Sequence, residues 1–369
     1  FILPGFIDCH VHVMFQISKM ERALNTPFSL KFYKAAGYLR STLDAGITSA
    51  RDAGGADLGV KQAVEQGIIA GPRLQISTAV LGITGGHVDD WYPSGTNVNL
   101  FGPPYPGMPD GICDGVEEVR KKVREVLRAG ADVVKICSTG GVLSPTDHPE
   151  FTQFSPEELQ AIVQEAAYRR GIKVMAHAQG AEGIKQSVRA GIHSIEHGIF
   201  LDEEAIELML ENGTFLVPTL LAPVAVLEIG EAGGMPDFGL QKSREVIDIH
   251  RDSIRRAHGL LEPFRTLGEG HDLDAAPVSG FLDDNLQFPR RKLSELGMVG
   301  GAEHAAGGAN IDHVGAGAQH FAHLLAHFGH AVAQAVGHAG IAAEIAQGIS
   351  GRMPAVGVPA GDAQGGGAD

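Results

Sequence analysis

The stretch FIDCHVH at residues 6–12 has the pattern of an extended strand that carries two histidines. Successive side chains of a strand point to opposite faces, so His10 and His12 share one face. At the start of a barrel, two imidazoles side by side would form one edge of a metal site. The alternative is a buried strand with two hydrogen-bonded structural histidines, and the H-x-H spacing alone does not separate the two.

Strands and helices alternate over the next 250 residues or so, which favours a parallel α/β sheet. The predicted strands after the first comprise residues 47–52, 73–81, 132–138, 172–177, 192–198 and 214–219. The predicted helices comprise residues 28–45, 57–68, 115–129, 155–170, 180–190, 202–212 and 241–258. An irregular insertion is predicted before the last helix, and a structureless loop over residues 82–114. Seven strand–helix units therefore precede residue 258, one short of a (β/α)8 barrel.

Three residues in these strands carry chemistry. Lys135 lies in an apolar strand, where an ammonium is costly unless it is paired, neutralised or modified. A strand-end lysine in an ion pair is the alternative. His177 and His197 end the fifth and sixth predicted strands, where a barrel presents its active site. His193 has the same parity as His197 but lies deeper, and we interpret it as structural.

Two glycine-rich loops follow predicted strands. Gly85, Gly86 and His87 open the 82–114 loop, and loops of this length within a compact domain are usually functional. His87 could equally be a loop histidine held by turn hydrogen bonds. Gly140 and Gly141 form a tight loop after the strand that carries Lys135. At the C-terminal ends of barrel strands, both loops would lie on the catalytic rim.

The composition excludes several classes of partner. Of the 369 residues, 44% are hydrophobic and 20% charged, as in ordinary globular proteins, and the net charge of −15 argues against nucleic acid and anionic membranes. The three cysteines form no C-x-x-C pair, which argues against a disulfide framework and favours a cytoplasmic location. The chain begins with Phe1 rather than Met, so we expect that its true N-terminus is missing and leave a signal peptide open. A homo-oligomer is compatible with these features.

The regular pattern stops after His258. The expected eighth strand with a terminal aspartate is not found, and Pro263 interrupts the one apolar run that could replace it. Residues 259–299 match poorly, and residues 300–369 form an Ala/Gly/His-rich tail. We therefore predict a barrel over residues 1–299 and a low-complexity or frame-shifted tail. Asp272, Asp274 and Asp284 are candidates for the missing aspartate only by their place in the sequence.

Over residues 3–258 the chain resembles the amidohydrolase superfamily. The branch is that of imidazolonepropionase-like proteins, Xaa-Pro dipeptidases and arginine or lysine carboxypeptidases. The matching motifs are PGFIDCHVH at 4–12, GGH at 85–87, VKI at 134–136 with TGG at 139–141, MAHA at 175–178, IEHG at 195–198 and the run 144–155. The resemblance implies a (β/α)8 TIM barrel with an incomplete or aberrant eighth unit, lacking most of the accessory β-sandwich of the family.

The family's metal ligands match five residues of this chain. In the family, the first-strand histidine pair binds one metal, a carboxylated lysine of the fourth strand bridges two, and histidines ending strands five and six bind the second. The resemblance therefore implies two divalent metal ions, with zinc the first choice. The matching residues are His10, His12, Lys135, His177 and His197.

The same resemblance implies hydrolysis of an amide bond in a small peptide by a metal-activated hydroxide. Dipeptides with a C-terminal proline or basic residue are the expected substrates. His87 would polarise the scissile carbonyl, and Gly140 and Gly141 would contact the substrate. The alternatives are an imidazolonepropionase-like hydrolase of cyclic amides, and a metal-binding barrel without activity because the proton-shuttling aspartate is missing.

Overall fold

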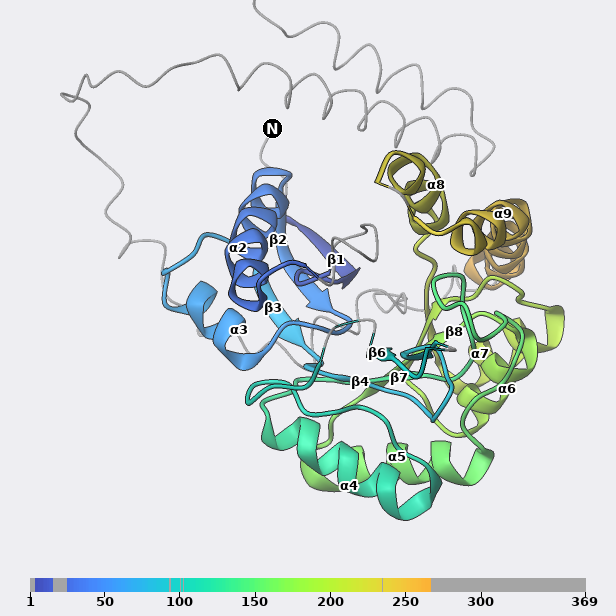
Figure 1. Ribbon diagram of the computed structural model, residues 1–369. Helices are drawn as coiled ribbons and strands as arrows, with labels where there is room; N and C mark the ends of the chain where they lie inside the picture. Colours follow the sequence, from blue (N-terminus) through green and yellow to red (C-terminus); the bar gives the residue numbers. More distant parts are fainter. Residues whose placement is uncertain are drawn as a thin grey trace, which may run out of the picture. The chain divides into compact units, whose positions relative to one another are not determined.

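The computed structural model describes residues 4–15, 25–92, 94–99, 101, 103–233 and 235–266 (Figure 1). All of them belong to the first of two compact units, Phe1–Gln287 and Phe288–Asp369. The predicted tail and most of the segment 259–299 lie outside the described residues. The same holds for Asp272, Asp274 and Asp284.

Parallel strands follow one another in chain order. They are β1 (Phe6–Val11), β2 (Ile47–Asp52), β3 (Arg73–Ile76), β4 (Val80–Leu81), β7 (Val134–Cys137), β8 (Val174–Ala178), β9 (Ser194–His197) and β10 (Phe215–Val217). They pair in the orders β1-β2-β3 and β4-β7-β8-β9-β10. The third predicted strand is confirmed as two pieces, β3 and β4, because Thr78 between them has a φ of 60° and interrupts the extended backbone.

Helices connect these strands, as the alternating pattern predicts. They are α2 (Phe28–Asp44), α3 (Leu58–Glu65), α4 (Gly115–Arg128), α5 (Pro156–Arg170), α6 (Ala181–Arg189), α7 (Glu203–Asn212), α8 (Leu221–Gly233) and α9 (Asp237–Thr266). The helices α2, α3 and α4 pack on β2, β3 and β7, and α5 and α6 pack on β8. The parallel α/β architecture is confirmed. Among the described residues, β1 and β3 are the end strands of one sheet and β4 and β10 those of the other, and no further parallel strand follows β10.

Two predictions of irregular structure are wrong. The loop 82–114 contains an antiparallel hairpin, β5 (Asp89–Trp91) and β6 (Asn97–Asn99), in which the Asn97 amide donates to the Asp89 carboxylate at 2.5 Å. The insertion before the last helix contains α8, and α9 begins at Asp237 and extends to Thr266. Glycine and proline near both segments weaken the sequence patterns of these strands and of α8, which contacts with the rest of the fold stabilise. Strand β8 also continues one residue past His177, to Ala178.

Local sequence explains the helix boundaries, as α5 shows. Ser155 is its N-cap and accepts from the Glu158 amide, while the Glu158 side chain accepts from the Ser155 amide, a capping box reinforced by Pro156. Gly171 ends the helix with a φ of 65°, a conformation that glycine adopts without steric cost.

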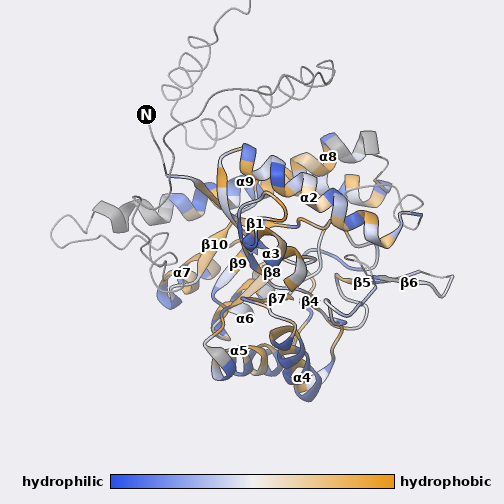
Figure 2. Ribbon diagram, turned by 90° about the vertical axis from the view of Figure 1, so that its left-hand side faces the viewer, coloured by the Kyte–Doolittle hydropathy of each residue, from blue (hydrophilic) through white to orange (hydrophobic). Residues whose placement is uncertain are grey.

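Two hydrophobic clusters hold the strands to the helices. The larger joins β7, β8 and β9 to helices α4–α7 and includes Ile136 and Ile195, both fully buried. The smaller joins β1–β3 to α2 and α3 around Leu39 and Ile76. Burying each such side chain contributes roughly 1.5–3 kcal/mol. In Figure 2, hydrophilic residues are prominent on α4, which carries acidic and basic side chains outside its buried valines.

None of the helices in the described residues is long and apolar enough to cross a bilayer.

Candidate active site

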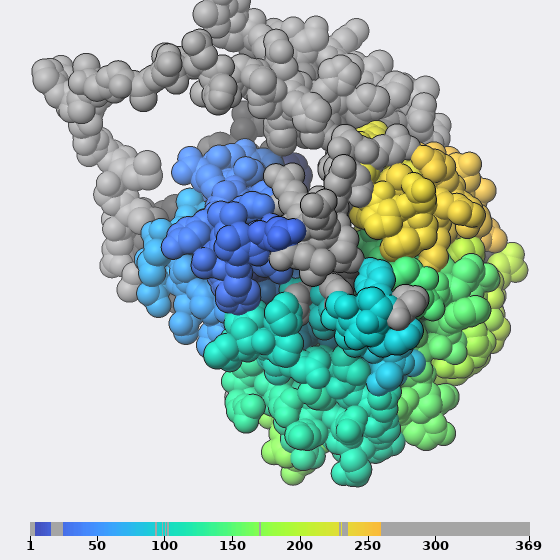
Figure 3. All heavy atoms as spheres, in the orientation of Figure 1, coloured from blue at the N-terminus to red at the C-terminus, as the bar shows by residue number. Residues whose placement is uncertain are grey.

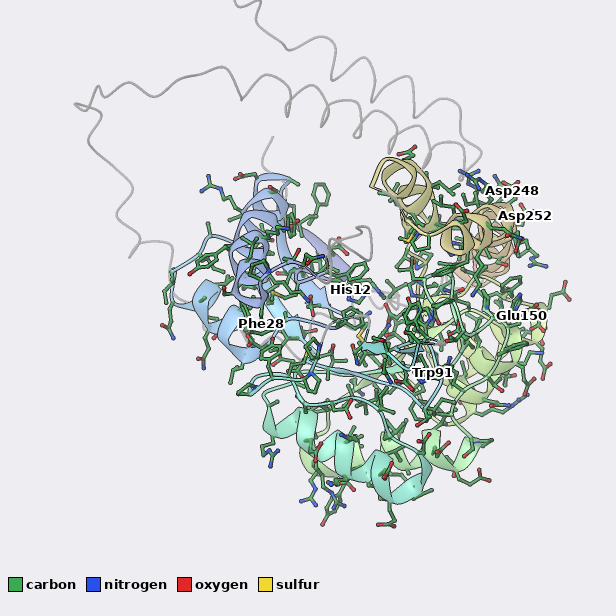
Figure 4. All side chains as sticks on the ribbon, viewed as in Figure 1. His12, Phe28, Trp91, Glu150, Asp248 and Asp252 are labelled. Carbon is green, nitrogen blue, oxygen red and sulfur yellow. The ribbon has the colours of Figure 1, made fainter. Side chains whose placement is uncertain are left out.

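Five histidines from separate parts of the chain meet at the C-terminal ends of the strands. Parallel register places His177 of β8 level with Cys137 of β7 and with Glu196 of β9. Figure 4 labels His12, which lies just past the end of β1. Neighbouring rings are in contact distance, with these centroid separations: His10–His12 5.1 Å, His10–His197 4.9 Å, His177–His197 4.6 Å and His87–His177 4.3 Å.

Four of these rings are each oriented by one hydrogen bond. The pairs are His10 Nδ1 with Glu196 Oε2 at 2.7 Å, His12 Nδ1 with Gly54 O at 3.0 Å, His177 Nε2 with Gly140 O at 3.0 Å, and His197 Nδ1 with Thr219 Oγ1 at 2.7 Å. Within the described part of the chain, the other nitrogen of each ring has no hydrogen-bond partner. Metal-ligating histidines show this division, because one nitrogen binds the ion and the other donates to a neighbouring acceptor.

Burial keeps these imidazoles neutral. Desolvation lowers the pKa of His12 to about 4, and it lowers the pKa values of His10, His177 and His197 well below the usual range. Nearby positive charge, mainly from Lys135 and the other histidines, acts in the same direction. A neutral imidazole is the form that binds a metal ion.

Lys135 is near enough to His10, His12, His177 and His197 for its charge to lower the pKa values of all four. Its side chain is 3% exposed on β7, and its Nζ has no hydrogen-bond partner among the described residues. The alternative of an ion-paired strand-end lysine is therefore not what the structure shows. Desolvation lowers the pKa of Lys135 to about 8, against the opposing effect of Glu196. An uncompensated buried amine of this kind calls for a chemical explanation.

The histidines and Lys135 do not by themselves form a complete metal site. In the ranges that the structure describes, no three His, Cys, Asp or Glu side chains form a metal-binding group. Lys135 does not belong to these residue types. The four predicted histidine ligands lie together in the structure, and the role of all five predicted residues as metal ligands stays a prediction.

A buried ion pair beneath His10 was not found from the sequence. Glu196 is fully buried, and its Oε1 lies 2.8 Å from a guanidinium nitrogen of Arg51 and accepts from Ser194 Oγ at 2.7 Å. Its Oε2 pairs with His10. Arg51 is 4% exposed and also donates to the Cys9 carbonyl at 2.7 Å. A glutamate inside a predicted strand, directly after Ile195, was the available signal, since a buried carboxylate needs a partner.

The backbone of His197 is held in the left-handed region. His197 has a φ of 74°, and its hydrogen-bond partner Thr219 has a φ of 48°. The Nε2 of His250, on α9, pairs with the His197 carbonyl oxygen at 2.8 Å. Such conformations cost about 1–3 kcal/mol each and persist where the surroundings over-determine them, as at functional sites.

Asp52 secures the loop that orients His12. Its carboxylate accepts from the backbone amides of Val13, Gly54 and Ala56 at 2.8–3.1 Å, so it ties the end of β1 to the loop after β2. Complete burial nevertheless raises the pKa of Asp52 to about 7. The sequence placed Asp52 at a strand end without revealing this role.

His87 stands beside His177 and is paired with Asp147. Their Nδ1 and Oδ2 atoms are 3.2 Å apart, and the His87 ring stacks on His177 at an interplanar angle of 25°. Burial raises the pKa of the Asp147 carboxyl, but the hydrogen bonds from His87 and from the Gly141 amide and the charge of Lys242 outweigh it, and the net pKa is lowered. The His87 side chain is thus held by a residue of the loop after β7, and its role toward a substrate stays a prediction.

The two predicted substrate-binding glycines use their backbone groups internally. The Gly140 amide donates to Phe151 O, and its carbonyl pairs with His177. The Gly141 amide donates to Asp147, and its carbonyl accepts from Lys242. A Cβ atom at Gly141 would collide with the rings of His87 and His177. Glycine is thus required at 141 for the two rings to stack, and contact with a substrate stays a prediction.

The hairpin β5–β6 borders this rim. Figure 3 shows the region, coloured cyan, at the surface of the face in view, and Figure 4 labels Trp91 there. Trp91 is 54% exposed.

Comparison with known proteins points to one family. The model of the Amidohydrolase family matches residues 1–260. Ochratoxinase of Aspergillus niger is 40% identical over 281 residues, which are 73% of this chain and 58% of that protein. The crystal structure of a prolidase complexed with N-methylphosphonate-L-proline has 40% identity and a TM-score of 0.63, covering 70% of this chain and 62% of that one. A Xaa-Pro dipeptidase with bound methionine has 34% identity and a TM-score of 0.61, covering 70% and 63%.

Proposed function

This chain belongs to the amidohydrolase family, and we propose that it hydrolyses an amide bond in a small peptide with the help of divalent cations. One observation carries the proposal. Four imidazoles, each oriented by a hydrogen bond to one ring nitrogen, lie together near a buried lysine whose amine has no hydrogen-bond partner among the described residues. The chain spans less than two thirds of the ochratoxinase and prolidase chains that it matches, so the activity of the whole protein is part of the proposal.

The donor set fits the two metal ions that the family generally uses. His10 and His12 would hold one ion, and His177 and His197 the other. Lys135 would bridge them after its neutral amine has added carbon dioxide, forming a carbamate and releasing a proton. This modification would convert a costly buried amine into an anionic oxygen donor, which accounts for its unpartnered state. Imidazole and oxygen donors suit zinc first, and also manganese, cobalt or iron.

Bound cations would polarise the scissile carbonyl and lower the pKa of a water molecule at the site. The residues of the chain then have distinct tasks. Glu196 and Thr219 fix the orientation of His10 and His197. His87, with Nδ1 on Asp147, has Nε2 left to donate to the carbonyl oxygen as charge develops there.

The relatives suggest the substrate class. A prolidase and a Xaa-Pro dipeptidase are among the similar solved structures. Dipeptides that end in proline are therefore the first substrates to test, followed by dipeptides that end in arginine or lysine.

The test combines metal content with a substrate panel. Purified protein is analysed for bound metal and assayed on Xaa-Pro, Xaa-Arg and Xaa-Lys dipeptides and on a cyclic amide, with and without a chelator. We expect about two ions per chain and dipeptide cleavage that stops on chelation. His193→Gln, at a histidine outside the cluster, is the matched control and should keep its metal.

Two outcomes would contradict the proposal. Opening of the cyclic amide without peptide cleavage would assign the chain to the imidazolonepropionase-like alternative. Bound metal without turnover of any substrate would make it a metal-binding barrel without activity.

A further inference from the structure

The ammonium group of Lys242, on α9, is enclosed by main-chain carbonyls of the loop after β7. It donates to Gly141 O at 3.2 Å, Ser144 O at 2.8 Å and Asp147 O at 2.6 Å. The Lys242 side chain is 16% exposed, and its Nζ is 3.7 Å from Asp147 Oδ1. An ammonium has three N–H donors, so the three carbonyls satisfy it completely.

We propose that Lys242 is a positioning residue that locks the loop 141–147 and, through Asp147, sets the orientation of His87. The inference rests on the proposed function, in which His87 donates to the scissile carbonyl. It adds a residue from α9 that neither the sequence motifs nor the family resemblance identified.

The contacts form a continuous path from helix to ring. Lys242 holds the carbonyl of Asp147, and the Asp147 carboxylate accepts from the Gly141 amide at 3.2 Å and from the Gln153 amide group at 3.3 Å. The same carboxylate is 3.2 Å from His87 Nδ1. Release of the loop would therefore free the partner that fixes the His87 ring. A misplacement of about 1 Å at a catalytic group can cost about 100-fold in rate.

The helix that carries Lys242 is anchored on a second rim loop. Side chains of α9 donate to carbonyls of the segment after β9: His250 to His197 O, Ser253 to Ile199 O and Arg256 to Leu201 O. These contacts hold α9 in place independently of Lys242. Loss of the Lys242 side chain should therefore increase the mobility of the loop 141–147 and leave α9 in place.

The geometry argues against the simplest alternative role. A rim lysine could bind the C-terminal carboxylate of a peptide. Such binding would require Lys242 to give up carbonyl partners, which would leave buried acceptors unsatisfied at about 1–3 kcal/mol each. A positioning role keeps every one of these bonds.

The experiment uses Lys242→Met, Lys242→Arg and Lys242→Ala, with Lys61→Met as a matched control. Lys61 has similar burial, at 18% exposed, and pairs with Asp132 away from this loop. The first readout is amide hydrogen exchange over residues 139–153, which needs no turnover. We expect exchange to rise at least about tenfold in the Met and Ala variants and to stay unchanged in the control. Propylammonium, which replaces the atoms from Cγ to Nζ, should restore protection in Lys242→Ala.

The second readout is turnover of a dipeptide and of its C-terminal amide. If Lys242 holds the loop 141–147 in place, kcat of Lys242→Met and Lys242→Ala should fall about 10- to 100-fold for both substrates while KM changes little. Lys242→Arg is the check against misfolding, since it keeps the charge and should retain more protection than Lys242→Met.

Three results would overturn the inference. They are unchanged exchange in Lys242→Met, no rescue by propylammonium, and a KM rise confined to the substrate with a free carboxylate. If the unaltered protein turns over nothing, the proposed function fails, while the exchange data still decide whether Lys242 holds the loop.

Discussion

Replacing Glu196 by glutamine should destabilise the protein strongly, because it removes the counter-charge of a buried guanidinium. Glu196 is fully buried, and the Arg51 side chain is 4% exposed at a distance of 2.8 Å. Glutamine has nearly the same volume, so no cavity forms and the effect is electrostatic. Breaking a buried pair by removing one partner costs about 3–5 kcal/mol. That is a large share of the roughly 5–15 kcal/mol that stabilises a typical domain.

The assay is urea unfolding in the presence of a chelator, so that metal binding does not contribute. Glu196→Gln, Arg51→Met and the double variant complete a cycle. We expect the double variant to be more stable than the sum of the single changes by about 2 kcal/mol, since it leaves no lone charge in the interior. Asp44→Asn is the surface control. Asp44 and its partner Arg40 are 59% and 64% exposed, and loss of such a pair should cost less than about 1 kcal/mol.

Two results would refute this reasoning. If the single changes add within about 0.5 kcal/mol, Arg51 and Glu196 are not coupled. If Glu196→Gln lowers the free energy of unfolding no more than Asp44→Asn does, burial does not set the strength of the pair.

Four further predictions concern other parts of the chain. Lys135→Met should bind fewer than two metal ions and lose hydrolysis; elemental analysis that still finds two would contradict its bridging role. Burial, with smaller effects of Lys173 and Arg51, lowers the pKa of His193 to about 4. Between pH 6.5 and 4 the unfolded chain therefore binds a proton that the folded chain does not, so the free energy of unfolding decreases as the pH falls through this window. Unfolding of His193→Gln should therefore depend less on pH over that window, and an unchanged profile would show that His193 does not titrate there. Ile136→Ala, in the centre of β7, should lower the free energy of unfolding by about 2–5 kcal/mol, and a loss under about 1 kcal/mol would mean that the site collapses around the gap. Ser155→Ala removes half of the α5 capping box and should cost about 1 kcal/mol in a urea titration, whereas Ser155→Asp should cost much less.

The sequence alone was sufficient to predict those structural features whose physical cause lies within a few neighbouring residues. Strand periodicity placed His10 and His12 on one face, and the serine–proline–glutamate start of α5 predicted its N-terminus. Lys135 was conspicuous because an amine in an apolar strand has to be explained. Segments with mixed signals were harder. The sequence predicts irregular structure where the hairpin β5–β6 and the helix α8 form, because glycine and proline near them weaken the pattern of elements that the surrounding fold stabilises.

The sequence by itself determined the alternation of parallel strands and helices, the membership of the family and the four predicted histidine ligands that lie together. Only the tertiary structure decided what holds those residues. Arg51 pairs with Glu196 across 145 positions of the chain, and Lys242 reaches Ser144 across 98. Hydropathy patterns and secondary-structure propensities depend on a few neighbouring residues. These distant pairs form because a buried charge or carbonyl needs a hydrogen-bond or charge partner, and the fold decides which residue lies close enough to provide it.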